Sequence, residues 1–275
     1  MHVTIQAPNQ ILSPYIKQMV YYTDYVPDYF ATRMLPEPSI ELLFALDEQP
    51  RHFSKDRNTQ FSCKGVFVAG MQRAPLVAKA SGKTMLVVTF KPGGSSPFLH
   101  LPQSELNDLF VDADLIFGKK IWQLRECLLE CKTVQKMFSL TEQFLLKCMV
   151  STNTHQIIQE SVKRLQSGSD RMSIRGLSRM SGYSQKQFIA LFKQHVGITP
   201  KLYQRLNRFN MALDEIYAAV EPDWHTIAYT FGFFDQAHFI NEFKTFSGSS
   251  PTVYLRSKGD YPNYVPLYEK TDSAV

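Results

Sequence analysis

The sequence predicts an α+β protein, with a β-rich first half that also contains helices and an all-α second half. Short runs of apolar and β-branched residues, bounded by proline and glycine, fill the first hundred positions. Beyond about residue 104, apolar residues recur at three- and four-residue spacings, as they do in helices. A helix–turn–helix pattern also occurs twice between residues 174 and 254, about fifty positions apart.

The length and composition suit a folded protein of two domains. The chain has 275 residues, of which 44% are hydrophobic, so a disordered chain is excluded. No run of 18 uncharged apolar residues occurs, and the N-terminus lacks the basic region of a secretory signal. We therefore expect a cytoplasmic protein with no membrane span.

The first half contains three segments that we expect to be strands, at residues 39–47, 65–70 and 84–94. Ser104 is suited to cap a helix, and helical spacing continues to about residue 150. The short polar segment 151–154 marks a domain boundary. The expected divisions are a first domain at 1–150, a helical domain at 155–256 and an irregular tail at 257–275.

The repeat consists of nine positions that agree in residue type and order. The first three pairs are 50 residues apart and the other six are 51 apart, so the second copy contains one extra residue. The pairs are Leu177/Ile227, Ser178/Ala228, Gly182/Gly232, Phe188/Phe239, Phe192/Phe243, Lys193/Lys244, Gly197/Gly248, Pro200/Pro251 and Tyr203/Tyr254.

Each copy has the chemistry of a helix–turn–helix. Gly182 and Gly232 suit a sharp turn with positive φ, and Ser184 and Asp235 are suited to cap the helix that follows. The phenylalanines of that second helix fall on one face and would anchor it to a core. Its polar face is then free to enter the major groove of DNA. The alternative is a plain helical bundle. It is the weaker explanation, because the pattern occurs twice in the same order.

Charge is divided unevenly between the two copies. Residues 171–208 contain eight basic residues and no acidic one, whereas residues 214–256 contain two basic and six acidic residues, a net charge of −4. A basic block indicates a polyanionic partner such as double-stranded DNA, the alternative being a solvated helix face. We therefore expect the first copy to anchor the DNA and the second to contribute less. The acidic residues Glu221, Asp223 and Asp235 either offer a surface to a basic partner or cap helices.

Residues 155–256 resemble the AraC/XylS family of transcription regulators. The most specific segment is "IAYTFGFFDQAHFINEFKTFSGSSPTVYLR" at 227–256. The resemblance implies seven helices forming two helix–turn–helix units, joined by a linker helix at residues 200–218. It also implies a transcription activator that works with RNA polymerase.

The resemblance implies which residues contact DNA. In the first unit the recognition helix begins at Ser184, and in the second the contacting positions are again on the helix after the turn. Lys186, Lys193 and Arg208 are expected to bind mainly phosphates. The expected DNA-binding residues are Ser184, Gln185, Lys186, Ile189, Ala190, Lys193, Arg208, Gln236, Ala237, His238, Ile240, Asn241 and Lys244.

The first half resembles the β-rich, cupin-like domain of many such regulators. The resemblance rests on "FKPGG" and "LPQSELNDLFVDADLIFG", and it implies effector binding or dimerisation. The apolar helices between about Ile121 and Val150 are expected to contribute to a homodimer interface. A regulator without a small-molecule effector, controlled by abundance or a protein partner, is the alternative.

Signals for catalysis, cofactors and metals are weak. No nucleotide-binding glycine motif is present, and His52 and His100 stand apart from any group of ligands. Cys63, Cys127, Cys131 and Cys148 include no CxxC pair and are expected to be reduced. We therefore expect no cofactor, no metal and no enzyme. A remote alternative is an alkyl-transfer DNA repair enzyme, for which Cys63 would have to be the acceptor.

Overall fold

A computed structural model describes the chain except residues 57, 151–152, 167–172 and 269–275. The predicted fold class is confirmed, because two antiparallel sheets with flanking helices precede a helical domain. Part of the expected boundary segment, residues 151–152, and the basic residue Arg171 lie outside the described residues.

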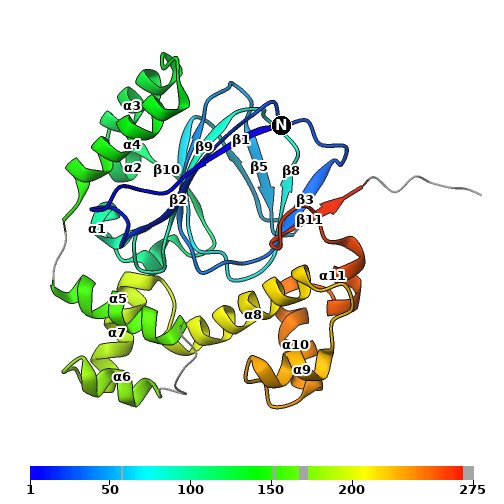
Figure 1. Cartoon of the computed structure of the whole chain (residues 1–275). Helices are drawn as coiled ribbons and strands as arrows, with labels where there is room; N and C mark the ends of the chain where they lie inside the picture. Colours follow the sequence, from blue (N-terminus) through cyan, green and yellow to red (C-terminus); the bar gives the residue numbers. More distant parts are fainter. Residues whose placement is uncertain (57, 151–152, 167–172, 269–275) are drawn as a thin grey trace, which may run out of the picture.

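The first domain is a sandwich of two sheets (Figure 1). The six-stranded sheet has the order β1-β2-β9-β4-β7-β10, and the five-stranded sheet has the order β11-β3-β8-β5-β6. All three expected strand segments contain strands, namely β4, β7 and β9. The strands are β1 (His2–Gln6), β2 (Ile16–Thr23), β3 (Ala31–Met34), β4 (Glu41–Ala45), β5 (Arg51–Ser54), β6 (Gln60–Cys63), β7 (Val66–Ala69), β8 (Leu76–Lys79), β9 (Met85–Phe90), β10 (Phe110–Asp112) and β11 (Tyr264–Leu267).

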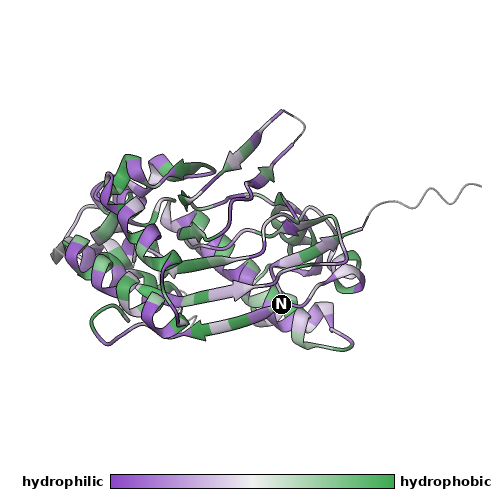
Figure 2. Ribbon diagram, turned by 90° about the horizontal axis from the view of Figure 1, so that it is seen from above, coloured by the Kyte–Doolittle hydropathy of each residue, from purple (hydrophilic) through white to green (hydrophobic). Residues whose placement is uncertain are grey.

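The six-stranded sheet separates two cores, because successive side chains of a strand point to opposite faces. On β4, Leu42 and Phe44 belong to the large core shared with the helices, whereas Leu43 belongs to the small core between the sheets. Seen from above, apolar segments run along the strands and the adjacent helices (Figure 2). The small core surrounds a cavity, and the large core continues into the second domain.

The helices of the first domain cover one side of the sandwich (Figure 1). They are α1 (Ser96–Leu99), the 3-10 helix η1 (Gln103–Leu106), α2 (Asp114–Phe117), α3 (Lys120–Leu129) and α4 (Val134–Cys148). Ile121 and Leu128 of α3 and Phe138 and Leu145 of α4 are fully buried within the chain. The apolar stripe therefore packs in its own core, which removes the reason given for a homodimer interface there.

Two local predictions are wrong. Ser104 does not cap an α-helix but lies inside η1, whose N-cap position is Pro102. The tail is not irregular throughout, since its residues 264–267 form β11, which pairs antiparallel with β3. Pro266 lies in β11, which is at the edge of its sheet, where a residue without an N–H is tolerated.

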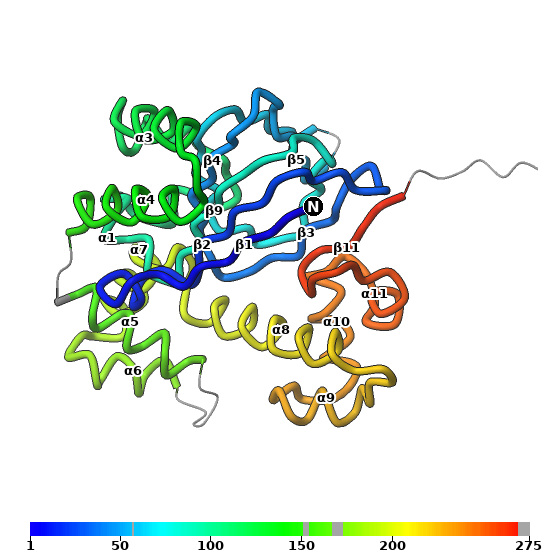
Figure 3. The backbone as a smooth tube through the Cα atoms, turned by 45° about the horizontal axis from the view of Figure 1, so that its top comes forward, coloured from blue at the N-terminus to red at the C-terminus, as the bar shows by residue number. Residues whose placement is uncertain are grey.

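The second domain contains α5 (Asn153–Gln166), α6 (Ile174–Met180), α7 (Gln185–Val196), α8 (Pro200–Ala218), α9 (Trp224–Thr230), α10 (Gln236–Ser247) and α11 (Pro251–Ser257). Helix α8 has the expected bounds of the linker. It runs below the sandwich and connects the α5–α7 group to the α9–α11 group (Figure 1). The chain then returns to the first domain, where β11 lies beside β3 (Figure 3).

The end of α7 docks on the first domain. His195 Nδ1 lies 2.7 Å from the Ser96 hydroxyl oxygen, and Asn107 Nδ2 donates to the Gly197 carbonyl at 2.7 Å. Gly197 has φ of 99°, and a Cβ there would lie 3.0 Å from the Asn107 amide oxygen, so only glycine fits this contact well. Burial, and secondly the nearby His155, lowers the pKa of His195 to about 4.

This docking predicts a loss of stability in mild acid. The His195 pKa is lowered from an ordinary ~6.5, so its stabilising effect is complete above pH 6.5 and is lost as pH falls towards about 4. His195→Asn keeps a polar side chain near Ser96 but does not titrate. Between pH 7.5 and 4, the wild-type free energy of unfolding should fall by up to about 3 kcal/mol more than that of the variant.

Urea denaturation at each pH measures this difference. His225→Asn, which changes an exposed histidine on α9, is the matched control and should retain the wild-type pH dependence. If the free energy of unfolding of the wild type and of His195→Asn depended on pH in the same way, His195 would not be the cause of the loss of stability in acid.

Candidate nucleic-acid interface

Two helix–turn–helix units are present, α6–α7 and α9–α10. Gly182 and Gly232 occupy the turns with φ of 75° and 69°, which confirms the positive φ expected of them. Gly197 and Gly248, which end α7 and α10, also have positive φ. The repeat in the sequence is therefore a repeat in backbone conformation.

Helix α7 is capped and anchored as predicted. Ser184 accepts from the Gln187 backbone N–H, and the Gln187 side chain accepts from the Ser184 N–H, which makes a capping box. Phe188 and Phe192 are fully buried. The apolar face thus holds the helix and leaves the other face to solvent.

The outward face of α7 carries the polar residues expected to contact DNA. Gln185, Lys186, Ala190 and Lys193 are all exposed, and Ile189 is half-buried. Arg175 and Arg179 on α6 are also exposed, so this unit presents several cations to solvent. An exposed helix face bordered by cations suits phosphate and base contacts in a major groove.

Helix α10 presents a similar face with less charge. Gln236, Ala237, Asn241 and Lys244 are exposed. His238 is half-buried, and its Nδ1 accepts from the Phe234 backbone N–H at 3.2 Å. Nδ1 is the acceptor in this bond, which leaves Nε2 as the ring nitrogen that can donate.

Several charges that the sequence assigned to the surface are paired or act as caps. Arg205 of α8 donates two bonds to the Glu242 carboxylate of α10, at 2.9 and 2.7 Å. Asp223 accepts from the His225 N–H and caps α9, and Asp235 accepts from the His238 N–H and caps α10. The capping explanation is therefore confirmed for these two aspartates, while Glu221 is exposed.

Arg208 has a structural contact that competes with its expected role at phosphates. Its Nη1 donates to the Gly232 carbonyl at 2.9 Å, and its guanidinium lies 5.1 Å from the centroid of the Phe233 ring. Both contacts fix the turn of the second unit against the linker helix. The residue spacing in the sequence does not indicate this structural role of Arg208, because the hydrogen-bond partner is a backbone atom in another helical unit.

Two exposed aromatic residues border α10 and were not among the expected contacts. Phe234 is 91% exposed and Tyr229 of α9 is 83% exposed. Phe234 occupies the extra position that changes the repeat spacing from 50 to 51 residues, so the signal for it was present in the sequence. An apolar ring there could contact a thymine methyl group or a deoxyribose.

Comparison with known proteins identifies the helical half. A family model described as a helix-turn-helix domain matches residues 177–257, a range that includes the linker, the second unit and most of the first unit. Residues 177–257 are therefore similar to a helix-turn-helix domain, in agreement with the resemblance to AraC/XylS regulators. A second family model, described as a domain of unknown function (DUF6597), matches residues 5–112.

Individual relatives are distant. A probable transcriptional regulator, LumQ of Photobacterium leiognathi, is 29% identical over 119 residues, which cover 40% of this chain and 48% of LumQ. The match thus spans about half of that relative.

Two solved structures show some similarity to this chain. ToxT of Vibrio cholerae bound to an unsaturated fatty acid is 13% identical, with TM-score 0.47, over 86% of this chain and 94% of ToxT. The C-terminal domain of AraT from Geobacillus stearothermophilus is 21% identical, with TM-score 0.35, over 45% of this chain and 97% of that domain.

The sandwich domain has a cavity of about 90 Å³ between its sheets. Glu41 and Gln72 contribute polar groups to its wall, and Phe53 and Phe110 contribute stacked rings. Burial, and secondly the charge of Glu37, raises the pKa of Glu41 to about 7. The lining residues are Met34, Leu35, Glu37, Ser39, Glu41, Leu43, Phe53, Ala69, Gly70, Gln72, Leu76, Phe110, Asn263 and Tyr264.

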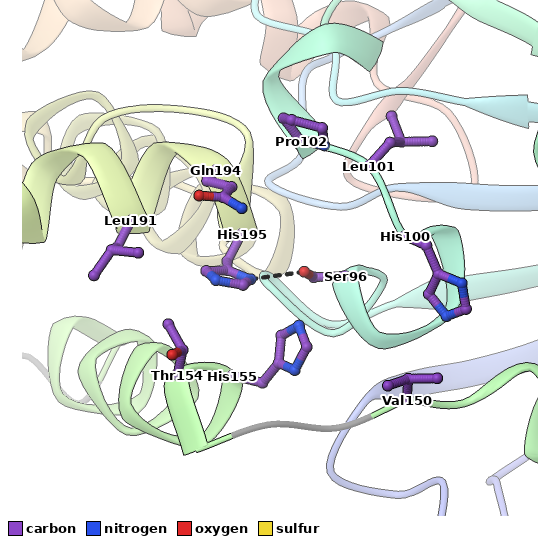
Figure 4. Close-up of a pocket in the computed structure, with 10 residues that line it drawn as sticks. All are labelled: Ser96, His100, Leu101, Pro102, Val150, Thr154, His155, Leu191, Gln194 and His195. Atoms are coloured by element: carbon purple, nitrogen blue, oxygen red, sulfur yellow. Dashed lines mark hydrogen bonds between the residues drawn. The ribbon is translucent and has the colours of Figure 1, made fainter.

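A larger cleft of about 490 Å³ lies between the two domains (Figure 4). His155 of α5 and His195 of α7 face each other there, with ring centroids 4.7 Å apart, and His100 lies farther along. Within the described residues, no group of three or more histidine, cysteine, aspartate or glutamate side chains is placed to hold a metal ion. The cleft is lined by residues of both domains.

The cysteine required by the repair-enzyme alternative is unsuited to the task. Cys63 is buried, and its burial, with the charge of Asp112, raises the pKa of the thiol to about 12. A nucleophilic cysteine needs a lowered pKa, because the thiolate is the reactive form. The side chain also lies in the core between the sheets.

The contacts of Arg208 predict that its removal lowers stability. Arg208→Ala removes a hydrogen bond to a carbonyl and a cation–aromatic contact, so we expect the free energy of unfolding to fall by about 1–2 kcal/mol. Urea denaturation measures this, with Arg179→Ala as the control because Arg179 is an exposed arginine on α6. Unchanged stability combined with weaker DNA binding in Arg208→Ala would instead support the phosphate role.

Proposed function

We propose that the protein is a sequence-specific DNA-binding transcription regulator, with two recognition helices that read neighbouring segments of one DNA duplex. The observation that supports this most directly is the pair of anchored helices, α7 and α10, whose outward faces are polar and exposed. Both are attached to α8, which is about 27 Å long, near the ~34 Å between successive major-groove faces. The expected DNA-binding residues belong to this proposal.

The first unit is proposed as the main anchor. Its exposed cations Arg175, Arg179, Lys186 and Lys193 can neutralise phosphates, which supplies much of the affinity for DNA. On the outward face of α10 Lys244 is the exposed cation, and Arg205 is occupied by Glu242. The second unit then adds contacts through Gln236, His238 and Asn241.

We propose that the regulator responds to a small-molecule effector held in the cavity between the sheets. The cavity combines an apolar wall with a few polar groups, which is typical of ligand sites. The alternative is control by abundance or by a protein partner. DNA binding that does not change with any added ligand would favour this alternative.

Further parts of the proposal concern partners. An activator would contact RNA polymerase, and the exposed Glu221 is one acidic residue available for a basic polymerase subunit. A protein that acts on chromosomal DNA would work in the cytoplasm of a bacterial cell. No described helix is long and apolar enough to cross a membrane.

A homodimer is also proposed, with a contact different from the one expected at first. Strand β1 is at the edge of its sheet, and its Val3 and Ile5 side chains are 38% and 59% exposed. Apolar side chains on an open edge favour association with a second copy. Light scattering at micromolar concentration should show a dimer, and Ile5→Lys should yield a monomer; a monomeric wild-type protein contradicts this part.

The anchoring model predicts unequal effects of two substitutions. Lys186→Ala should weaken binding to a selected genomic fragment more than Asn241→Ala, because the first unit supplies most of the phosphate contacts. Fluorescence anisotropy on one labelled fragment measures both affinities. An equal or larger loss of affinity from Asn241→Ala would contradict the anchoring model.

A salt titration tests the phosphate role of Lys193. Lys193→Ala should weaken all sequences similarly and reduce the slope of log affinity against log salt by about one. Lys147→Ala, an exposed lysine on α4 in the first domain, should leave the slope unchanged. A changed sequence preference in Lys193→Ala would show that this side chain reads bases instead.

A further inference from the structure

We propose that the cavity between the two sheets binds a small organic cation, an ammonium group on a short apolar body, and that the C-terminal strand β11 transmits its binding to the linker helix α8. The regulatory half of this inference rests on the proposed function. The binding half does not, because it follows from the groups that line the cavity.

The polar wall of the cavity contains two side chains, Gln72 and Glu41, with hydrogen-bond acceptors that are still available. Gln72 Nε2 donates to the Gly70 carbonyl at 2.8 Å, and since a carbonyl only accepts, this bond fixes the orientation of the amide. Gln72 Oε1 then points away from it, and it is buried without a hydrogen-bond partner. The Glu41 carboxylate, which lines the same cavity, accepts from the Thr89 hydroxyl at 3.1 Å and has further lone pairs available. A ligand that donates several hydrogen bonds would satisfy both residues.

The charge of the cavity also favours a cation. Among the described residues, no lysine, arginine or histidine forms an ion pair with Glu41, and Lys17 reaches only Glu37, at 3.8 Å. Glu37 and Glu41 thus both lie in the cavity wall, and burial, with the charge of Glu37 as the second cause, raises the pKa of Glu41 to about 7. An ammonium ion beside Glu41 would stabilise the ionised form of this carboxyl group and would donate hydrogen bonds to Glu41 and Gln72.

The size and the apolar wall limit the ligand. The cavity volume of about 90 Å³ is several times the ~10–15 Å³ that one water needs, but well below the ~300 Å³ of sites for drug-sized molecules. Phe53 and Phe110 are stacked with centroids 4.0 Å apart, and Leu43 and Leu76 complete the apolar side. A single ring or a short alkyl chain with one amine matches this shape.

The C-terminal strand connects the cavity to the DNA-binding half. Asn263 and Tyr264, at the start of β11, line the cavity, and Tyr264 pairs with Met34, which also lines it. Asn263 Nδ2 donates to the Asn210 side-chain oxygen of α8 at 3.1 Å, and Asn210 Nδ2 donates to the Pro36 carbonyl at 3.1 Å. Asn210 thus bridges the two segments that flank the cavity, and a shift of either on ligand binding would move α8.

The binding half is tested with three probes of one shape on the full chain. Benzylamine, benzyl alcohol and benzoate differ in whether the head group is cationic, neutral or anionic. Isothermal titration calorimetry should show benzylamine binding at least about tenfold more tightly than benzyl alcohol, as expected of a buried charge-assisted hydrogen bond, and no binding of benzoate. Equal binding of the alcohol, preference for benzoate, or no binding of any of them overturns the inference.

Variants locate the site. Glu41→Gln should reduce the benzylamine affinity by about tenfold or more and leave benzyl alcohol unaffected, whereas Glu130→Gln, at an exposed carboxyl after α3, should change neither. Unchanged benzylamine affinity in Glu41→Gln contradicts the site. Should Glu41→Gln fail to fold by circular dichroism, the ranking of the three probes on the wild-type chain decides.

The coupling half is tested with Asn210→Ala, which alters the bridge but not the cavity lining. In the wild type, benzylamine should change the affinity for a selected genomic fragment, and in Asn210→Ala benzylamine should still bind while that change disappears. A response that persists in the variant overturns the coupling. A chain that binds benzylamine selectively but binds no DNA refutes the proposed function and leaves the cation site intact.

Discussion

The docking of the end of α7 on the first domain determines where both recognition helices lie. The contacts of His195 with Ser96 and of Gly197 with Asn107 hold α7, and α8 begins only three residues after Gly197. The direction of α8 is therefore set by this contact, and α8 in turn holds the second unit through Arg205 and Glu242. Because one large core continues through both domains, a change in the first domain can reach the DNA-binding surface through packed side chains.

The sequence predicted the features that depend on local chemistry. The turn glycines and the caps at Ser184 and Asp235 are each set by residues within a few positions of one another, whereas the linker bounds followed from the family resemblance. Strand β11 and the role of Arg208 depend on partners far away in the chain, for which spacing gives no signal. The apolar helices at 121–150 show the same limit, since their pattern requires burial but does not say whether the covering surface belongs to this chain or to another.

The charge pattern of the sequence correctly indicated that the first unit is the more basic one, but it overestimated the difference in charge between the two units. Arg205 and Glu242 were counted on opposite sides of a contrast between the two units, yet they neutralise each other across the α8–α10 contact. Asp223 and Asp235 satisfy helix N-termini, where a carboxylate is favoured by the local dipole. What remains on the first unit is a set of exposed arginines and lysines on α6 and α7, so the contrast survives in a weaker form.

The pairing of β11 with β3 makes the helical domain an insertion within the sandwich rather than an appendage to it. The chain leaves the sandwich after α4 and returns to it at Tyr264, so both ends of the helical domain are tethered. A fragment that stops near residue 150 lacks the outermost strand of the five-stranded sheet and leaves β3 as a bare edge, which is a template for aggregation. Exchange of DNA-binding halves between related regulators would face the same obstacle, because a donor half must bring a tail that fits the recipient's sheet.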